Sequence, residues 1–506
     1  MDRPYSPGYS PLKLSIRPVS IYLQLLLGYF LLHTLIRLWL SPTLTWDEAE
    51  QVHMSEFLLI SYNAQPPLYT WLQQAFFALL GTNLLAVVVL NNLTLAAIHA
   101  LVFLLVYRIG KQRITAFIAS GCVLFIPPLA VQPHQDLTHT LMATLSTLMV
   151  VASVLSLQEK PSTARYTTLG LVIGLALLSK HNIAMFLLLV LATAAFSTRL
   201  QPLLRDRRLW LSVLIALAIF LPHVIAVIVH WDTEVAPTLN KMAGRHQDAG
   251  ILMGLDQLQQ RIFNSLWLFM IVAGLLYRFA STPVAKESLW QRHWLQHLLL
   301  AILVGLLLLV FAGARHFREA WLLPFLVLIP VWFGLVLTQR RLNYQKLWFA
   351  AITLAALASL TVVAARVMQA DKLNKFYRVN YPYQAVIETL AERKVDFSEA
   401  QILTRYDVDT GNLKLAYPQA TIGLTRFPAS LARQPLTSDE VWLAWYGYEM
   451  EQEFEIPATL KTGYQRWSGC QGNFGQVHAI QAPMLYSQSK AFWFHYARAS
   501  ADKSRC

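Results

Sequence analysis

The amino-acid sequence predicts a polytopic α-helical membrane protein with a small soluble α/β domain at its C-terminal end. The first supporting observation is composition, because 56% of the 506 residues are hydrophobic and only 14% are charged, whereas soluble domains carry about 25% charged residues. The second is that long apolar runs, many of them close to the length that crosses a bilayer, recur up to residue 366. The third is that residues 371–506 contain no such run. We therefore expect a membrane domain, residues 1–366, and a soluble domain, residues 371–506.

The apolar runs predict about eleven transmembrane helices. They centre on residues 21–40, 84–106, 114–131, 138–157, 166–179, 183–197, 209–229, 263–279, 297–313, 320–338 and 347–365. We interpret residues 1–20 as the lead into a retained first helix, because no small-residue cleavage site follows the apolar run. Residues 66–81 are also apolar, but counting them as a span would put the basic clusters that follow on the outside. We therefore place them at the membrane surface as a juxtamembrane helix, a depth that suits their aromatic side chains.

The distribution of basic residues predicts the topology. With residues 66–81 at the surface, eighteen of the Lys and Arg residues before Arg366 fall on one side of the membrane and seven on the other. Since basic loops remain in the cytoplasm, we expect a cytoplasmic N-terminus and an exported C-terminal domain. The exported loops are then 41–83, 131–139, 230–262 and 314–319. Topology thus explains the net charge of +13 without a nucleic-acid partner.

The C-terminal domain is expected to be small and of α/β type. Residues 400–404 and 441–446 are typical of short strands, and residues 379–394 are typical of a helix. Cys470 and Cys506 would both be exported, where a disulfide is permitted, and we favour two free thiols. With Cys122, the three cysteines are too few for a disulfide scaffold and lack metal-ligand spacing.

The first exported loop is acidic. Asp47, Glu48 and Glu50 lie within four residues, and no Lys or Arg occurs between residues 41 and 83. Such carboxylates beside a membrane indicate a metal, a cationic partner or acid–base chemistry. The alternative is a solvated helix start, since acids favour helix N-termini.

Later exported segments add one acid and several cations. Asp136 precedes a helix in a very short loop, where it either meets the first loop or caps that helix. Residues 166–197 form two runs too short to cross a bilayer separately, with Lys180 at their polar apex. Arg315 and Arg318 lie at the outer end of a span, where they either anchor lipid headgroups or bind a phosphate.

These motifs together resemble a known family. In order along the chain they are Asp47-Glu48-Ala49, the segment 62–71 around Pro66-Pro67-Leu68, Asp136, Leu178-Ser179-Lys180 and Trp321-Leu322-Leu323-Pro324. They are similar to the motifs of bacterial GT-C glycosyltransferases, the relatives of protein O-mannosyltransferases and of the lipid A aminoarabinose transferase. The resemblance covers roughly residues 20–340. It implies a GT-C fold in a bacterial inner membrane, with the C-terminal domain in the periplasm.

The resemblance also implies a reaction and a set of site residues. A sugar leaves a polyprenyl (undecaprenyl) phosphate carrier for an envelope acceptor (lipid A or lipopolysaccharide, another glycolipid, or a protein), with inversion at the anomeric carbon. Expected partners are this lipid-linked donor, the acceptor and membrane lipids. The assigned residues are Asp47, Glu48 and Asp136 as catalytic acids, Lys180, Arg315 and Arg318 for the carrier phosphate, and Tyr62, Gln65 and Tyr69 for positioning the acceptor or the loop. The chemistry agrees, because a hydroxyl acceptor needs a base and the departing phosphate needs cations.

Two features leave alternatives open. The aminoarabinose transferase carries an acid and a lysine just before its proline, where this chain has Ala64 and Gln65. No cofactor is therefore certain, and Glu48 and His53 are the candidate ligands for a possible divalent metal. A transporter or flippase of a lipid-linked substrate would also need exported charges and a broken helix pair, and a noncatalytic membrane scaffold is a third class. The C-terminal domain is expected to shape acceptor access without contributing a catalytic group.

Overall fold

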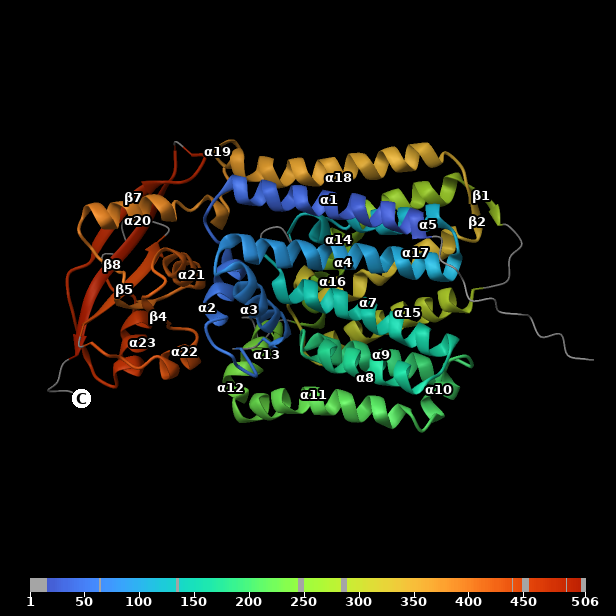
Figure 1. The fold of residues 1–506 in the computed structure, drawn as a ribbon, viewed down its shortest axis with the longest axis horizontal. Coiled ribbons are helices and arrows are strands. Elements are labelled where there is room, and N and C mark those ends of the chain that lie inside the picture. The colour runs from blue at the N-terminus through green and yellow to red at the C-terminus, as the bar shows by residue number, and fades with distance from the viewer. Residues whose placement is uncertain are drawn as a thin grey trace, which may run out of the picture.

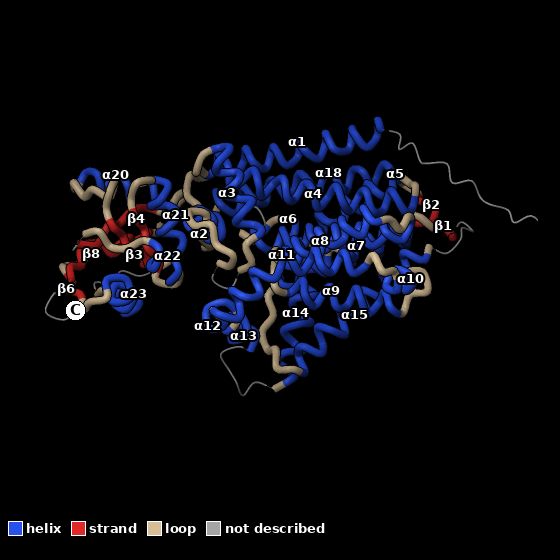
Figure 2. Tube along the Cα trace, turned by 60° about the horizontal axis from the view of Figure 1, so that its bottom comes forward, coloured by secondary structure: helices blue, strands red, loops and turns tan. Residues whose placement is uncertain are grey.

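The protein consists of a bundle of long helices with a six-stranded sheet at one end. The computed structural model describes residues 16–62, 65–132, 136–243, 250–283, 289–438, 440–447, 455–487 and 489–501. The long helices run roughly along the long axis of the molecule, and helices α2 (Trp46–Met54) and α3 (Leu68–Leu80) lie between the bundle and the sheet (Figure 1). The turned view shows the same end-to-end arrangement (Figure 2).

Helices form at all eleven of the predicted apolar runs. Within the described residues, eight helices are long and apolar enough to cross a membrane. These are α1 (Ile16–Leu40), α4 (Leu84–Gly110), α7 (Thr138–Glu159), α11 (Leu209–Val229), α14 (Ile251–Phe279), α15 (Trp290–Phe311), α16 (Glu319–Leu326) continued by α17 (Leu328–Leu337), and α18 (Gln345–Met368). Three are shorter: α5 (Arg113–Gly121) continued by the 3-10 turn Cys122–Phe125, α8 (Thr163–Leu177) and α9 (Asn182–Ala195). A total of eleven spans depends on these three and stays a prediction.

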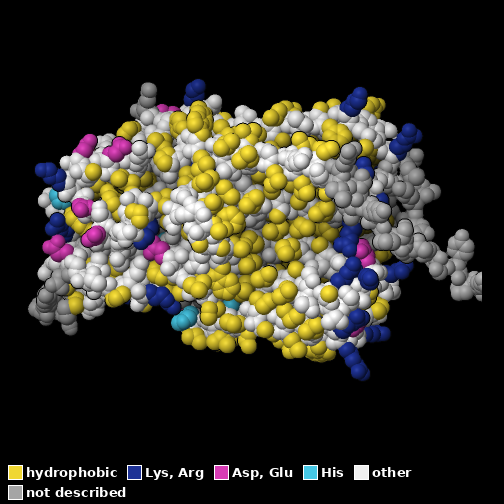
Figure 3. Space-filling view, viewed as in Figure 1, with side chains coloured by type: hydrophobic (Ala, Val, Ile, Leu, Met, Phe, Trp, Pro, Cys, Tyr) yellow, Lys and Arg dark blue, Asp and Glu magenta, His cyan; other side chains and the backbone are white. Residues whose placement is uncertain are grey.

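The outer surface of the bundle is apolar. Figure 3 shows a broad belt of hydrophobic side chains across the helices, with charged side chains gathered toward the two ends. Leu25, Leu214 and Leu308 are each more than 60% exposed. A soluble monomer rarely exposes apolar patches of this extent, whereas lipid tails accommodate them without cost. The surface is therefore that of a membrane-embedded bundle.

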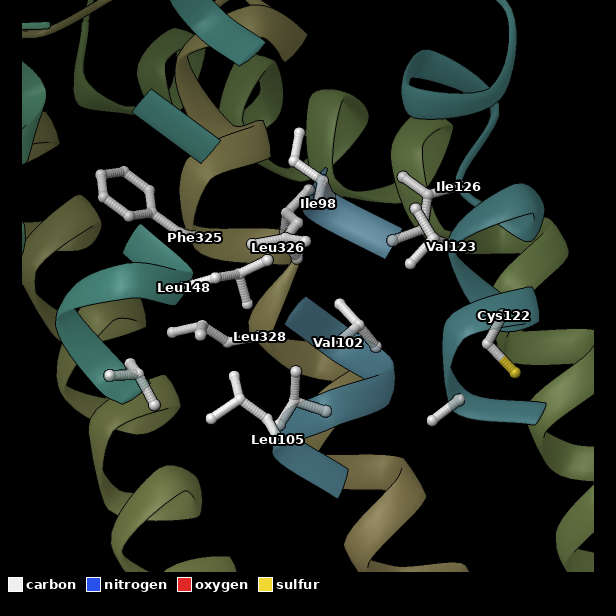
Figure 4. Close-up of a cluster of buried hydrophobic side chains, with 14 of the residues drawn as sticks. Ile98, Val102, Leu105, Cys122, Val123, Ile126, Leu148, Phe325, Leu326 and Leu328 are labelled. Carbon is white, nitrogen blue, oxygen red and sulfur yellow. The ribbon is translucent and has the colours of Figure 1, made fainter. Parts of the chain in front are cut away.

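Aliphatic side chains from neighbouring helices fill the interior. Ile98 and Val102 of α4, Leu148 of α7, and Phe325 and Leu326 of α16 lie together in one buried cluster (Figure 4). Close packing of branched side chains fixes how these helices sit against one another. The loops at the sheet end of the bundle, which carry the predicted site residues, thus extend from a rigid base.

The connections differ from expectation at one place. The predicted exported loop 230–262 is largely helical, with α12 (Trp231–Glu234), α13 (Ala236–Ala243) and the first turns of α14. The remaining short elements of the bundle are α6 (Pro127–Ala130), α10 (Gln201–Arg205) and the antiparallel pair of β1 (Ala280–Pro283) and β2 (Arg340–Leu342). Helix α3 has 13 residues, too few to cross a bilayer. It packs against α4 and α7, and its place at the membrane surface stays a prediction.

The sheet at the end of the bundle is mixed. Its order is β4-β3-β5-β8-β6, with β7 also paired to β8, and only the β3–β4 and β3–β5 pairs are parallel. The strands are β3 (Gln401–Thr404), β4 (Thr421–Leu424), β5 (Glu440–Gly447), β6 (Gly472–Phe474), β7 (His478–Pro483) and β8 (Ala491–Ala501). The helices are α19 (Ala370–Leu373), the 3-10 turn Arg378–Asn380, α20 (Tyr383–Glu392), α21 (Asp407–Ala416), α22 (Pro428–Arg433) and α23 (Ala458–Ser468). The strands expected near residues 400–404 and 441–446 are β3 and β5.

The cysteines differ from the expectation of two free thiols. Cys470 is disulfide-bonded, so that expectation is wrong for this residue. Cys122 is free and buried, and Cys506 lies outside the described residues.

The C-terminal sheet region docks on α2 through α21. Asn412 Oδ1 accepts a hydrogen bond from the Leu44 backbone N–H at 2.9 Å, and the Thr43 hydroxyl donates to the Tyr381 carbonyl at 2.6 Å. The two helices approach so closely at Gly411 that an added Cβ would lie 2.5 Å from the Ala49 Cα. Only glycine fits between these two backbones. The region therefore holds a defined position against the acidic helix.

We expect Gly411→Ala to destabilise this docking by about 1–3 kcal/mol, the usual cost of overpacking a tight contact. The added methyl meets backbone, which cannot rotate away. Thermal denaturation of the purified protein in detergent measures the effect as a lower melting temperature. Gly274→Ala is the matched control, because an added Cβ there meets nothing within 4 Å. Equal melting temperatures for the two variants would contradict the close approach of α21 to α2.

Candidate active site

Two loops that are predicted to be exported meet at the N-terminus of α7. Asp47 lies in the first turn of α2, and its Oδ2 accepts hydrogen bonds from the backbone N–H groups of Leu137 (2.6 Å) and Thr138 (3.2 Å). The Asp47 backbone N–H in turn donates to Asp136 Oδ1 at 3.2 Å. Asp47 thus caps a helix other than its own, and Asp136 supports Asp47 instead of capping α7. The two predicted acids are in direct contact.

Burial raises the pKa of both acids. Loss of solvent raises the pKa of Asp47, while the two N–H donors of α7 and the positive charges of Lys180 and Arg378 oppose this change. Burial and the negative charge of Asp47 raise the pKa of Asp136 to about 7. A carboxylate with a raised pKa accepts a proton more readily than an ordinary one. The raised pKa of Asp47 therefore meets the chemical requirement of a general base.

Glu48 has a different environment. Its carboxylate forms a buried bidentate ion pair with Arg37 of α1, with Nε–Oε1 at 3.0 Å and Nη2–Oε2 at 2.6 Å. The Thr45 backbone N–H also donates to Glu48 Oε2 at 2.8 Å, completing a capping box at the start of α2. The expectation that no cation compensates the first-loop acids is wrong for Glu48, because its partner precedes the loop in sequence. These contacts give Glu48 a structural role, and the catalytic role expected for it stays a prediction.

Lys180 lies at the turn between α8 and α9, where its Nζ donates to the Thr140 hydroxyl at 2.6 Å. Burial lowers the pKa of Lys180 to about 8, with a further decrease from the positive charge of Arg318 and an opposing increase from Asp47. Lys180 therefore lies near both the predicted acids and the predicted phosphate-binding arginine. The turn is also tied to other motifs, since the Leu68 N–H donates to the Leu178 carbonyl at 3.0 Å and Asn182 Nδ2 to the Trp321 carbonyl at 2.9 Å.

The two predicted arginines have different surroundings. Arg315 Nη1 donates to the Val310 carbonyl at 2.7 Å, at the C-terminal end of α15. Its backbone N–H donates to the Met242 carbonyl of α13 at 2.8 Å. Arg318 instead contributes positive charge toward Lys180 and Lys241. Arg318 is thus the better candidate for a phosphate ligand, and Arg315 serves α15 as a C-terminal cap.

Of the three residues predicted to position the loop or the acceptor, Tyr62 and Tyr69 are buried and Gln65 is half-buried. The Tyr62 hydroxyl donates to the Phe57 carbonyl at 2.5 Å and accepts from the Leu59 N–H at 2.9 Å, and its backbone pairs with that of Gln65. These contacts shape the loop between α2 and α3. Tyr69 is fully buried beside His139 of α7, and its hydroxyl has no partner within the described residues. Tyr62 and Gln65 thus position the loop, and Tyr69 lies beneath the acids.

The candidate metal ligands do not form a metal site. Glu48 is occupied by Arg37, and His53 is fully buried with its ring against the edges of Phe57 and Phe427. Burial lowers the pKa of His53 to about 3, which keeps the ring neutral. Across the described ranges, no group of three His, Cys, Asp or Glu residues is placed to hold a metal ion. Glu48 and His53 therefore do not fit as joint ligands of one metal ion.

The sequence interpretation missed a set of charged residues that the C-terminal region contributes. Asp407 forms an ion pair with Arg426, and the negative charges of Asp407 and Asp47 raise the pKa of Glu50, after the larger effect of burial. Burial raises the pKa of Asp407 to about 6, an increase that Arg426 opposes. The guanidinium groups of Arg378 and Arg426 both lie against the Trp46 ring, with Cζ 4.6 Å and 4.3 Å from its centroid. Trp46 directly precedes Asp47, so these groups belong to the same site.

The sequence contained one signal that could have identified Asp407 and Arg426. Asp407 and Arg426 follow the parallel strands β3 and β4, and ligand-binding residues of α/β sheets gather at the carboxyl ends of parallel strands. The signal required knowing that this edge faces α2, which the sequence does not indicate. Arg378, in a short 3-10 turn, had no such signal.

The structure thus places a buried carboxylate near several cations at the loop end of an apolar-surfaced helical bundle. Residues 64–225 match the family described as dolichyl-phosphate-mannose-protein mannosyltransferase. The chain is 32% identical over 440 residues to the lipopolysaccharide core galacturonosyltransferase RgtB of Rhizobium johnstonii, covering 84% of this chain and 88% of that protein. It is 26% identical over 423 residues to RgtA of the same organism, covering 80% and 82%.

Solved structures agree in fold. ArnT from Cupriavidus metallidurans bound to undecaprenyl phosphate has a TM-score of 0.53 at 13% identity, covering 96% of this chain and 99% of that chain. Its apo structure has a TM-score of 0.54 at 13% identity, covering 85% and 93%. The chain belongs to the GT-C glycosyltransferase family that includes the galacturonosyltransferase RgtB. It is an enzyme, and family membership favours a transferase over the transporter and scaffold alternatives.

Proposed function

We propose that the protein transfers a sugar, galacturonic acid, from a polyprenyl phosphate carrier to a lipopolysaccharide core acceptor at the outer face of the bacterial inner membrane. The sugar and the acceptor are inferred from the names of RgtB and RgtA, and the carrier from the undecaprenyl phosphate bound to ArnT. The observation that carries the proposal is the position of Asp47, which is held at the N-terminus of α7 within electrostatic reach of Lys180 and Arg378.

The proposed reaction is a single inverting displacement. The acceptor hydroxyl oxygen attacks the anomeric carbon, and the bond from that carbon to the phosphate oxygen breaks. The hydroxyl proton passes to Asp47, whose raised pKa suits it to accept one. The departing polyprenyl phosphate keeps the electron pair, and Lys180 and Arg318 stabilise its negative charge. Asp136 contributes by holding the Asp47 backbone in place.

The orientation that places this site outside is part of the proposal. Lys and Arg are concentrated in the loops at the end of the bundle opposite the sheet, so that end is cytoplasmic. Reporter fusions after Arg113 and after Gln369 test the topology. We expect a cytoplasmic signal from the first and a periplasmic signal from the second, and the reverse of either would overturn the orientation.

Transfer in detergent tests the activity itself. Purified protein, supplied with polyprenyl phosphate galacturonate and a lipopolysaccharide core, is expected to release polyprenyl phosphate and to add one uronic acid to the core, measured by mass spectrometry. Detergent micelles have no second compartment, so a transporter or flippase would leave the donor intact. An unchanged donor in the presence of folded protein would overturn the proposal.

Lys180 is expected to give the reaction a basic pH limit. Its pKa is lowered to about 8, so its positive charge is present below that pH and lost above it. We expect donor affinity to fall as the pH rises through about 8. Lys180→Arg, whose guanidinium stays charged, is expected to remove this decline, and Lys180→Ala to weaken donor binding by about 1.5–3 kcal/mol at neutral pH.

The measurement is donor binding from pH 6 to 10 on wild type and both variants. Arg315→Ala is the control, because Arg315 caps α15 and its loss is expected to lower the melting temperature more than donor affinity. A pH profile that Lys180→Arg leaves unchanged would contradict the role of Lys180.

A further inference from the structure

The cations of the site form two separate groups. Lys180 and Arg318 come from loops of the membrane bundle, where they act on each other. Arg378 and Arg426 come from the C-terminal region and share the Trp46 ring. Asp47 is within electrostatic reach of both Lys180 and Arg378. A substrate that reacts at Asp47 therefore meets positive charge on two sides, and one phosphate at the membrane surface accounts for only one of them.

Arg378 is the unassigned member of this arrangement. Arg426 is paired with Asp407, whereas the Arg378 guanidinium makes no hydrogen bond or ion pair within the described residues. Its Nε is buried and lacks a partner. Its charge acts on Asp47, Asp136 and Asp407 without a direct contact to any of them. A buried donor without a partner costs free energy, and a bound anion would supply the missing acceptor.

A carboxylate is the anion that suits this position. The planar guanidinium donates two parallel hydrogen bonds to a carboxylate, and stacking on Trp46 holds the plane of Arg378 in place. The negative charges of Asp47 and Asp136 disfavour a phosphate monoester, which carries up to two negative charges against the single charge of a carboxylate, at this short range. The sugar named for the relatives, galacturonic acid, has one carboxylate on its ring.

We propose that Arg378, positioned by Trp46, binds the carboxylate of an acidic sugar in the active site and so selects uronic acid chemistry over neutral sugars. The inference rests on the proposed function. Two sources supply the same group, namely the sugar being donated and an acidic sugar of the acceptor core. In either case Arg378 is a specificity residue from the region that was expected only to shape acceptor access.

The test compares substrates that differ only in this group. The donors are polyprenyl phosphate galacturonate and polyprenyl phosphate galactose, and the acceptors are a lipopolysaccharide core and the same core with its carboxylates reduced to alcohols. Donor affinity and kcat/KM are measured for wild type, Arg378→Gln and Arg378→Lys. Lys375→Gln is the matched control, because it removes one positive charge from an exposed side chain three residues away.

We expect Arg378→Gln to lose about 10- to 150-fold with the carboxylate-bearing substrate, the equivalent of one charge-assisted hydrogen-bonded pair, and little with its neutral counterpart. Arg378→Lys keeps the positive charge but loses the two parallel N–H donors of the guanidinium, and it is expected to recover part of the loss. A loss that follows the donor carboxylate assigns the donor, and one that follows the acceptor carboxylate assigns the acceptor.

Two results would overturn the inference. Equal losses with acidic and neutral substrates, or an equal loss in Lys375→Gln, would show that Arg378 has a structural or general electrostatic role. If wild type releases polyprenyl phosphate from neither donor, the proposed function fails together with the inference. That result is distinguishable because it appears before any variant is compared.

Discussion

Asp47→Asn is expected to lower the transfer rate by about 10² to 10⁴, the usual contribution of a general base. Asparagine has nearly the same shape, and its side-chain oxygen can accept the hydrogen bonds that Asp47 receives from Leu137 and Thr138. The cap on α7 is thereby kept while the proton acceptor is lost. In the proposed reaction Lys180 and Arg318 bind the donor phosphate, so donor binding should persist. The measurement is the transfer rate and the affinity for polyprenyl phosphate on the same folded preparation.

The control for Asp47→Asn is Asp396→Asn. Asp396 is an exposed acid whose Oδ1 also accepts a hydrogen bond from a backbone N–H, that of Ser398 at 2.8 Å. Both variants replace a carboxylate that accepts a backbone hydrogen bond, and Asp396→Asn measures the effect of that change at an exposed turn away from the site. Near wild-type transfer in Asp47→Asn would reduce Asp47 to a helix cap. The pH dependence adds a second readout, because activity through a carboxylate base is lost as the pH falls through its raised pKa.

Glu48→Gln is expected to destabilise the protein by about 3–5 kcal/mol, the cost of leaving a buried partner charge uncompensated. Arg37 is 3% exposed and has no other carboxylate within the described residues, although its Nη1 and Nη2 also donate to the carbonyls of Ser41 (2.8 Å) and Thr43 (2.7 Å). The melting temperature in detergent should therefore fall clearly. The fraction that remains folded should still transfer sugar at close to the wild-type rate, because the Glu48 carboxylate is already occupied.

An exposed pair provides the comparison. Arg498 and Glu440 are also ion-paired, at 3.1 Å, but both side chains are more than 60% exposed, and such pairs contribute little to stability. Glu440→Gln should leave the melting temperature nearly unchanged. A stable Glu48→Gln variant with a large loss of turnover would support the catalytic role expected from its place in the acidic loop.

The sequence was sufficient to locate the apolar helices of the bundle. Each apolar run can be recognised from consecutive residues alone, because about 20 apolar residues in a row are stable only in lipid or in a large hydrophobic core. Residues 66–81 were separated from the spans by the distribution of basic residues along the chain, and α3 is a helix of only 13 residues. The order of motifs from Asp47 to Pro324 was likewise readable, and it predicted the family to which the chain belongs.

The partners of the charged groups were decided by tertiary structure alone. Arg37 and Glu48 belong to different predicted elements, and their pairing depends on how the end of α1 turns into α2. The placement of Arg378, Asp407 and Arg426 beside Trp46 depends on the docking of α21 against α2, through contacts such as that of Leu44 with Asn412. Composition and periodicity report whether a segment is buried, in lipid or in water. They do not report which buried surfaces meet, because that depends on the shape of side chains packed from distant parts of the chain.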